Sequence, residues 1–377
     1  MAKLTERQDN NSLRMLPMPK GLIDFSSNDY LGLARNEAIF IEASKLLEQK
    51  GVIANGATGS RLLTGNNALY GELEEVLASF FVTESALVIN SGYDANVGFF
   101  SAVPQRTDVV FYDELSHASI RDGIGMGLAQ SYKFKHNHLE SLNRQIDGAR
   151  ERKTDGDIYV VTESVFSMDG DTPDLEALAE LCTSKGAYLV VDEAHAVGVF
   201  GKMGEGLLNE LGLQDKVFAR IVTFGKAMGC HGAAILGSSA LKSYLVNFAR
   251  SFIYTTGMPP HSLATILAAY EHLSTSGVEQ RQLRAKIEFF KDQLRGHELE
   301  TYFISSNSAV HCCLVEGNEK VKNWSLRLQD KGFDVKPIMS PTVPKGQERL
   351  RFCLHSFNTE NEIKDVLLSL AKLFEKK

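Results

Sequence analysis

Six short apolar runs between residues 86 and 236 constrain the fold of this chain more than any other feature. The runs cover residues 86–90, 108–112, 158–162, 187–192, 219–224 and 233–236. Several are almost continuously hydrophobic and lack the polar alternation of a strand that has one face in water. Segments with helical spacing separate the runs. This alternation predicts an α/β domain whose mainly parallel sheet is covered on both faces.

One helix is predicted over residues 67–81, where apolar side chains recur at helical spacing. The carboxylates of Glu72, Glu74 and Glu75 fall largely outside this apolar stripe. We therefore expect an amphipathic helix with the three glutamates on a solvated face.

A second helix is predicted to begin near residue 171, between two of the apolar runs. Thr172 can cap its N-terminus, and Pro173 suits the first helical turn. Gly186 can end the helix before the next strand.

The length of 377 residues suits two or three domains of roughly 150 residues each. We expect an N-terminal segment over residues 1–45, a large α/β domain over 46–294 and a small α+β domain over 295–377. In the small domain, strands are predicted at 311–315 and 349–354, and helices at 321–331 and 361–374. A long helical stretch should precede it, running to about residue 294.

Composition narrows the class of protein. The 40 basic and 47 acidic side chains give a formal net charge of −7, which makes a nucleic-acid binder a poor first choice. The five cysteines form no CxxC pair, so no zinc site or other metal site is expected. No stretch approaches the ~18 apolar residues of a membrane span, and the start lacks a signal-peptide core. We expect a cytoplasmic protein without a membrane segment.

Asp192 and His195 follow a buried strand in the sequence DEAH. They should therefore lie at the carboxyl end of the sheet, where open α/β sheets bind ligands. The same four letters occur in helicases, but a helicase also needs a GxxxxGK[ST] phosphate loop. The chain contains no such loop, so the helicase hypothesis fails.

Lys226 lies in a glycine-flanked turn, TFGKAMG, directly after another apolar run. A lysine amine at this position can form a Schiff base with an aldehyde cofactor. Taken alone, a solvated loop lysine is the more common case.

A third strand leads into Ser91 and Gly92 and then into a helix. Such a turn directs backbone N–H groups at an anion, although an ordinary helix cap explains it equally well. His117 and Ser167 also follow apolar strands, and a lone histidine in that position is usually structural.

Together these residues fit one cofactor, pyridoxal phosphate. It requires a Schiff-base lysine, an anion site for its phosphate and a carboxylate against its pyridine nitrogen. Lys226, Gly92 with Tyr93, and Asp192 meet these requirements, each at the end of a predicted strand.

From about residue 24 to its end, the chain resembles the α-oxoamine synthases, which are fold-type I pyridoxal-phosphate enzymes. The resemblance rests on the motifs FSSNDYLG at 25–32, GSRLLTG at 59–65, SGY at 91–93, SHAS at 116–119, FSMDGD at 166–171, DEAH at 192–195, TFGK at 223–226 and PTVP at 341–344. It implies a mainly parallel, seven-stranded central sheet with helices on both faces and a smaller C-terminal α+β domain.

The resemblance also implies a role for each matching residue at the cofactor. Lys226 would form the Schiff base and later move the Cα proton of the substrate, and Asp192 would keep the pyridine nitrogen protonated. His195 and Ser167 would hydrogen-bond the phenolic oxygen of the cofactor, and His117 would stack on its ring. The phosphate would be held by Gly92, Tyr93 and Thr223.

Further residues would act on the substrates or across a dimer. Family members are homodimers with shared active sites, so Thr255 and Thr256 would reach the phosphate bound by the partner subunit. Arg351 would bind the amino-acid carboxylate bidentately, a task that suits a guanidinium. Thr342 and Arg14 are the remaining candidates for substrate binding, with Arg14 the match for an acyl-substrate arginine.

Within the family, Phe224, the segment IYTTGMPP at 253–260 and the pair Arg349 and Arg351 resemble members that use L-alanine. These members condense it with a pimeloyl thioester, on coenzyme A or acyl carrier protein, and release CO₂ to give 8-amino-7-oxononanoate for biotin synthesis. Sister enzymes join glycine to acetyl-CoA or succinyl-CoA, or serine to a long acyl chain. An aminotransferase and a cofactor-free partner subunit are the alternatives from other classes.

The chain departs from the family pattern at two places. Met339 stands where the family often has an arginine before PTVP, so any carboxylate contact of that arginine must come from elsewhere or be dispensable. The segment before Asp24 is also shorter than usual, which makes the match of Arg14 loose.

Overall fold

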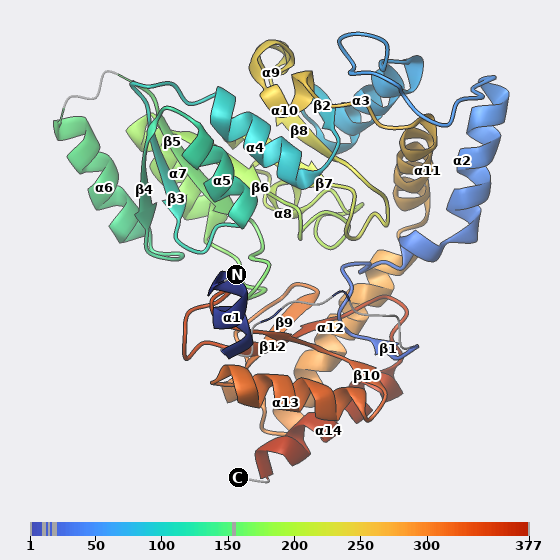
Figure 1. Ribbon diagram of the computed structural model, residues 1–377, viewed down its shortest axis with the longest axis vertical. Coiled ribbons are helices and arrows are strands. Elements are labelled where there is room, and N and C mark those ends of the chain that lie inside the picture. The colour runs from blue at the N-terminus through green and yellow to red at the C-terminus, as the bar shows by residue number, and fades with distance from the viewer. Residues whose placement is uncertain (1, 10–12, 14–15, 17–20, 153–155, 376–377) are drawn as a thin grey trace. The chain divides into compact units, whose positions relative to one another are not determined.

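The six apolar runs and one polar edge strand, β4, form a seven-stranded sheet in the computed structural model, in the order β2-β8-β7-β6-β5-β3-β4 (Figure 1). The strands are β2 Ser85–Ile89, β3 Val109–Asp113, β4 Gln130–Phe134, β5 Ile158–Glu163, β6 Tyr188–Asp192, β7 Ala219–Thr223 and β8 Ala233–Gly237. All neighbouring pairs are parallel except those that β8 makes with β2 and β7. The prediction of a mainly parallel, seven-stranded sheet is confirmed.

The structure describes residues 2–9, 13, 16, 21–152 and 156–375, which divide into two compact units. The larger unit comprises Gly32–Phe166 and Thr172–Gly277, and it holds the sheet. The smaller unit comprises the start of the chain up to Leu31, together with Ser167–Asp171 and the chain from Val278 onward. The domain boundaries expected after residues 45 and 294 stay a prediction.

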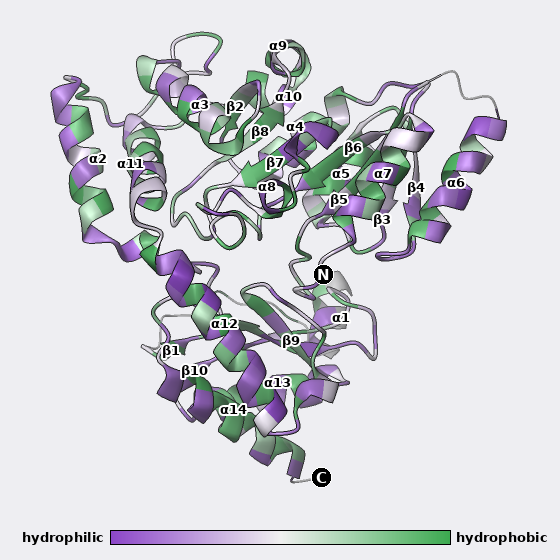
Figure 2. Ribbon diagram, turned by 180° about the vertical axis from the view of Figure 1, so that it is seen from behind, coloured by the Kyte–Doolittle hydropathy of each residue, from purple (hydrophilic) through white to green (hydrophobic). Residues whose placement is uncertain are grey.

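Helices cover the sheet because side chains on both faces of its strands are buried and apolar. Most of these strands are coloured as hydrophobic in Figure 2. The helices of the larger unit are α2 Glu37–Gln49, α3 Ala68–Phe81, α4 Gly92–Ala102, α5 Ala118–Met126, α6 Leu139–Glu151, α7 Leu175–Lys185, α8 Leu207–Glu210, α9 Ser239–Phe248, α10 Arg250–Ile253 and α11 Pro260–Ser276. One buried cluster joins alternate strand residues, such as Val161, Val190 and Ile221, to α4, α5, α9 and α10. The residues between them, such as Val160, face the opposite side.

The smaller unit is an α+β arrangement. Its strands are β1 Ile23–Asp24, β9 Val310–Leu314, β10 Phe333–Asp334, β11 Lys336–Ile338 and β12 Arg349–Cys353. They pair as an antiparallel sheet β11-β12-β9 and a parallel pair β1-β10. Its helices are α1 Ala2–Asp9, α12 Val278–Gly296, α13 Asn318–Gln329 and α14 Glu360–Glu375. Among the described helices, none is long and apolar enough to cross a membrane.

Two helix boundaries differ from the sequence-based prediction. The N-cap of α7 is Asp174, whose carboxylate accepts the Ala177 N–H at 3.0 Å. Thr172 and Pro173 precede the helix, because the stronger cap lies closer to its first apolar residue. Gly186 ends α7 with a φ of 59°, as predicted. The long helical stretch is broken at Gly277, which adopts a left-handed φ of 56° between α11 and α12.

One strand was not foreseen from the sequence, and the predicted exposure of Glu74 was wrong. The edge strand β4 was missed because four of its five residues are exposed and the segment has no apolar run. Glu74 is buried in α3 rather than solvated, because Arg61 and Lys242 neutralise it at 2.6 and 2.8 Å. Its carboxylate also accepts the Val88 N–H at 3.0 Å, which ties α3 to the edge of the sheet.

A buried ion pair fixes the segment after β6. Glu193, which follows the last residue of that strand, pairs with Arg220 of β7, and both side chains are almost fully buried. Glu193 also accepts the N–H groups of Leu207 and Leu208 at 2.7 and 3.0 Å, at the start of α8. This one carboxylate therefore holds together two adjacent strands and a helix terminus.

We expect Glu193→Ala to lower the free energy of unfolding by about 3–5 kcal/mol, because it leaves the Arg220 guanidinium buried without its carboxylate. Urea unfolding followed by circular dichroism measures the change. The exposed pair of Glu42 with Lys45 is the matched control, and Glu42→Ala should cost only about 0–1 kcal/mol. Equal effects of the two variants would contradict the role given to Glu193.

Candidate active site

Three polar side chains end three neighbouring strands on the same face of the sheet. Glu163 ends β5, Asp192 ends β6 and Thr223 ends β7. Glu163 and Asp192 are also direct register partners. Since alternate strand residues share a face, all three project to the side covered by α4 and α5.

The N-termini of two helices, α4 and α5, lie at these strand ends. Helix α4 begins at Gly92, and its N-cap Ser91 accepts the Asp94 N–H at 3.1 Å. Gly92 lies against Thr223: a Cβ atom at residue 92 would be 3.5 Å from the threonine hydroxyl. The remaining N–H groups of the first turn of α4 are suited to an anion such as a phosphate.

A cavity of about 200 Å³ lies where these elements converge. Its lining residues are Gly92, Tyr93, Asn96, His117, Ser119, Glu163, Asp192, Ala194, Ile221, Thr223 and Lys226. The structure thus brings together six of the residues singled out from the sequence, namely Gly92, Tyr93, His117, Asp192, Thr223 and Lys226.

The Asp192 carboxylate is held by two donors. Its Oδ2 accepts Nδ2–H of Asn96 at 2.8 Å, and its Oδ1 accepts the Ala194 N–H at 2.9 Å. Both bonds fix the orientation of the carboxylate in the cavity. Asn96 was not singled out from the sequence, because it lies in a helix and matches no catalytic motif.

A tight turn between β7 and β8 holds Lys226. The Gly229 N–H donates to the Lys226 carbonyl at 2.8 Å, and the Cys230 N–H donates to the Phe224 carbonyl at 2.8 Å. Gly229 has a φ of 63°, and a Cβ atom there would lie 2.1 Å from the backbone nitrogen of Ala34. Only glycine fits this position, so the turn that carries Lys226 is fixed by close backbone packing.

The charges in the cavity act on His117, the N-cap of α5. Burial lowers the pKa of His117, the nearby Lys226 ammonium lowers it further, and the Asp192 carboxylate opposes both effects. His117 is therefore favoured in its neutral form.

Glu163 is a cavity residue that the sequence analysis missed. Its side chain is buried, and its Oε1 accepts the backbone N–H of His117 at 2.6 Å. Burial, together with the Asp192 charge, raises the pKa of Glu163 to about 8, although Lys226 and the His117 N–H act in the opposite direction. The only available signal was a carboxylate one residue after the apolar run 158–162.

Other predicted residues lie outside the cavity lining. His195 is buried three residues after the end of β6. Thr255 and Thr256 lie beside Asn90, whose Nδ2 donates to the Thr255 hydroxyl at 3.2 Å and to the Thr256 carbonyl at 2.7 Å. Asn90 is two residues before Gly92, so the threonines flank the approach to α4 in the same chain.

The smaller unit contains Ser167, Thr342 and Arg351. The Arg351 Nε donates to the Ser167 carbonyl at 2.8 Å, and its guanidinium also donates to Oδ1 of Asn28 at 3.1 Å. Thr342 is exposed, and its N–H donates to the Met339 carbonyl at 2.9 Å. Arg14 lies outside the described residues.

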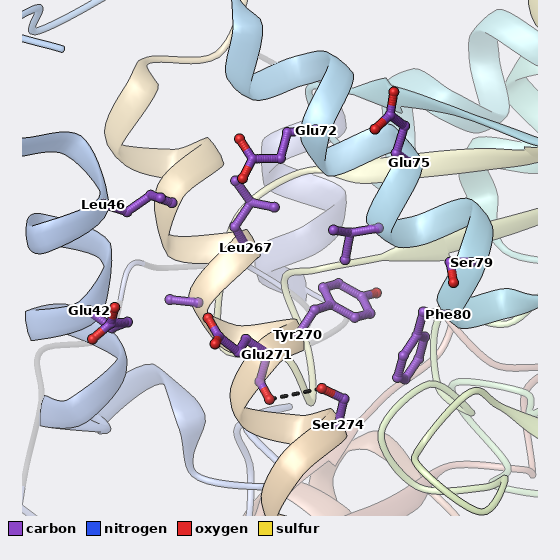
Figure 3. Close-up of a pocket in the computed structure, with 12 residues that line it drawn as sticks. Glu42, Leu46, Glu72, Glu75, Ser79, Phe80, Leu267, Tyr270, Glu271 and Ser274 are labelled. Carbon is purple, nitrogen blue, oxygen red and sulfur yellow. Dashed lines mark hydrogen bonds between the residues drawn. The ribbon is translucent and has the colours of Figure 1, made fainter. Parts of the chain in front are cut away.

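A second, larger cavity of about 580 Å³ lies among α2, α3 and α11 (Figure 3). Carboxylates of Glu42, Glu72, Glu75 and Glu271 surround an apolar floor that includes Leu267 and Phe80. No lysine or histidine occurs among the described residues that line it. It therefore lacks the groups that Schiff-base chemistry requires, and the smaller cavity is the candidate active site.

The chain is similar to known proteins along most of its length. The family model for aminotransferase class I and II matches residues 20–370. The chain is 39% identical to an 8-amino-7-oxononanoate synthase of Emericella nidulans, over 98% of this chain and 93% of that protein.

Solved structures show the same relationship. A serine palmitoyltransferase from S. paucimobilis superposes with a TM-score of 0.89 at 25% identity, covering 100% of this chain and 96% of that one. An 8-amino-7-oxononanoate synthase from Francisella tularensis superposes with a TM-score of 0.80 at 29% identity, covering 94% and 98%. The chain therefore belongs to the aminotransferase class I and II family, and within it to the α-oxoamine synthases.

Proposed function

We propose that this protein is a pyridoxal-phosphate-dependent acyltransferase that condenses L-alanine with a pimeloyl thioester, with loss of CO₂, to give 8-amino-7-oxononanoate. The observation that carries the proposal is the convergence of Lys226, Asp192 and the N-terminus of α4 in one cavity. The high identity to an 8-amino-7-oxononanoate synthase along almost the whole chain selects the substrates.

The residues of the cavity fit pyridoxal phosphate, which is bound in solved structures of the related serine palmitoyltransferase. Lys226 supplies an amine, Asp192 a carboxylate for the pyridine nitrogen, and α4 with Thr223 an anion site for the phosphate. Asn96 Oδ1 is buried and lacks a hydrogen-bond partner among the described residues, so the cavity also offers an unused acceptor.

Bound pyridoxal phosphate supplies an electron sink for the negative charge that develops at Cα of the amino acid. The residues of the chain manage the proton and the charges. Lys226 removes the Cα proton and returns it after CO₂ is lost. Asp192 would pair with the pyridine nitrogen, and Arg351 would bind the amino-acid carboxylate.

The remaining assignments belong to the same proposal. His117 stacks on the cofactor, His195 and Ser167 bind its phenolic oxygen, Gly92 and Tyr93 bind its phosphate, and Thr342 and Arg14 contact the substrates. Thr255 and Thr256 serve the partner subunit of a homodimer. We further propose a cytoplasmic enzyme whose acyl donor is carried on coenzyme A or on acyl carrier protein.

A second candidate is a synthase that joins serine to a long acyl chain. The observation that favours it is the higher TM-score of serine palmitoyltransferase, 0.89 against 0.80 for the Francisella tularensis enzyme. Sequence identity favours the alanine-using reaction, at 39% for the Emericella nidulans relative.

Thiol release distinguishes these reactions. The purified protein is given pimeloyl-CoA with L-alanine, glycine or L-serine, and palmitoyl-CoA with L-serine, and free thiol is followed. We expect release with pimeloyl-CoA and L-alanine, and a fall of roughly a thousandfold or more in Lys226→Ala. Lys226→Ala should also lose the visible absorption that the wild-type protein acquires with pyridoxal phosphate.

Release only with L-serine and palmitoyl-CoA would replace the proposed substrates and keep the enzyme class. Silence with all coenzyme A donors, repeated with pimeloyl-acyl carrier protein, would overturn the proposal. Full activity of Lys226→Ala would overturn the assignment of the lysine.

The buried carboxyl group of Glu163 predicts a pH dependence of stability in the cofactor-free protein. Its pKa rises from 4.5 to about 8 on folding, so the unfolded chain ionises first as the pH increases. Stability should therefore fall progressively between these two values. Glu163→Gln cannot ionise, so its melting temperature should exceed that of the wild type at pH 8 and match it near the lower end of this range.

Thermal unfolding of the wild type and the variant at several pH values tests this prediction. Glu180→Gln, at an exposed position of α7, is the control and should give a constant difference across the range. A Glu163→Gln protein that is less stable than the wild type at pH 8 would show that the ionised carboxylate is favoured.

A further inference from the structure

Two helices of the larger unit begin with a histidine N-cap, which allows a direct comparison. In α5, Nδ1 of His117 accepts the Ser119 N–H at 3.3 Å, and in α6, Nδ1 of His138 accepts the Ser141 N–H at 3.1 Å. A ring nitrogen that accepts a hydrogen bond carries no proton. In its neutral form each ring is therefore protonated at Nε2.

The hydroxyl groups of the two serines behave differently. The Ser119 Oγ lies 2.8 Å from Nδ1 of His117 and accepts Nδ2–H of Asn96 at 3.0 Å. Its own proton therefore points at the ring nitrogen. The Ser141 hydroxyl instead accepts the Lys135 N–H at 3.5 Å, and within the described part of the chain it makes no hydrogen bond to a ring nitrogen.

The amide of Asn96 sets the direction of this chain of bonds. One N–H of its Nδ2 donates to Asp192 Oδ2 and the other to Ser119 Oγ. In the opposite amide orientation, Oδ1 of Asn96, which can only accept, would face the oxygen atoms of Asp192 and Ser119. Asn96, Ser119 and Asp192 are all buried, so water does not compete with the bonds.

We propose that Asn96 and Ser119 are positioning residues that connect Asp192 to His117 and hold His117 as the neutral tautomer protonated at Nε2. The connection runs from the carboxylate of β6 through α4 to the first turn of α5. This inference deepens the proposed function and rests on it, since it describes how the chain prepares one cavity residue for the cofactor.

A neutral ring has a physical advantage at this position. A cationic imidazole would repel both the Lys226 ammonium and a protonated pyridine ring, whereas a neutral ring can lie against the pyridine. Since Ser119 occupies Nδ1, Nε2–H is the ring group that can act on a ligand.

Charged groups around His117 come from several elements. Glu163 of β5, Asp192 of β6 and Asp122 of α5 are carboxylates, while Lys226 and Arg121 are cations. Burial and the cations lower the pKa of His117, and Asp192 and Asp122 raise it. The bond from Ser119 favours the neutral ring and therefore adds to the lowering.

Nitrogen-15 NMR of histidine-labelled protein tests the tautomer. The full chain, with and without pyridoxal phosphate, is titrated with acid, and the shifts of Nδ1 and Nε2 of His117 are followed. We expect Nε2–H in both forms of the wild type. In Ser119→Ala the pKa of His117 should rise by roughly 0.5–1, because one hydrogen bond to the neutral ring is lost. A smaller rise is expected in Asn96→Ala.

Two further variants are the controls. Ser141→Ala, at the other histidine-capped helix, should leave the pKa of His117 unchanged. Ser119→Thr keeps the hydroxyl and should restore the wild-type pKa, and it keeps the test possible if Ser119→Ala does not fold. A wild-type His117 protonated at Nδ1, or a pKa that is equal in wild type and Ser119→Ala, would overturn the inference.

The enzyme assay separates this inference from the proposed function. In Ser119→Ala, kcat/KM should fall by about 2–10-fold and its acidic limb should shift with the pKa of His117, while Ser119→Thr recovers both. If thiol is released but His117 is protonated at Nδ1, only the inference is overturned. The expected tautomer in a protein without synthase activity would overturn only the proposed function.

Discussion

The alternation of side chains along parallel strands is the constraint on which the site depends. Because β5, β6 and β7 run in the same direction and stay in register, Glu163, Asp192 and Thr223 reach one edge on one face. The same face receives the N-termini of α4 and α5, where backbone N–H groups are available. A carboxylate pair, a hydroxyl and two helix termini thus converge without any long loop to position them.

This convergence places two acidic side chains, those of Glu163 and Asp192, next to each other. Glu163 and Asp192 are neighbours in a buried environment, where two negative charges repel strongly. The two carboxyl groups receive different numbers of hydrogen bonds from the surrounding donors. Asp192 accepts hydrogen bonds from the Asn96 amide and the Ala194 N–H, whereas Glu163 accepts one from the His117 N–H. Burial raises the pKa of Glu163, whereas two donors orient the Asp192 carboxylate, which suits a group that must face a cationic ring.

Sequence reasoning found residues that end apolar runs. Lys226, Asp192 and Gly92 could be identified because each follows a strand and has a motif around it, and the strands themselves were visible as uninterrupted hydrophobic segments. Glu163 has the same position relative to its strand but no motif, and so it was missed. The edge strand β4 was missed because an edge exposed to water needs no apolar run.

The contacts among these residues could not be predicted in the same way. The bond between Asn96 and Ser119 joins side chains from two helices, and it depends on how α4 and α5 pack rather than on any local pattern. Glu74 illustrates the same limit, because its burial depends partly on Lys242, which lies 168 residues further along the chain.

The close fit at Gly229 has a consequence for the order in which the chain assembles. The turn that carries Lys226 packs against the backbone of Ala34, so the two halves of this contact leave the ribosome far apart in time. A contact of such large sequence separation closes a long loop and tends to form late in folding. The segment near Ala34 must therefore wait for the middle of the chain to be synthesised, and the lysine reaches its final geometry only when both ends of this loop have met.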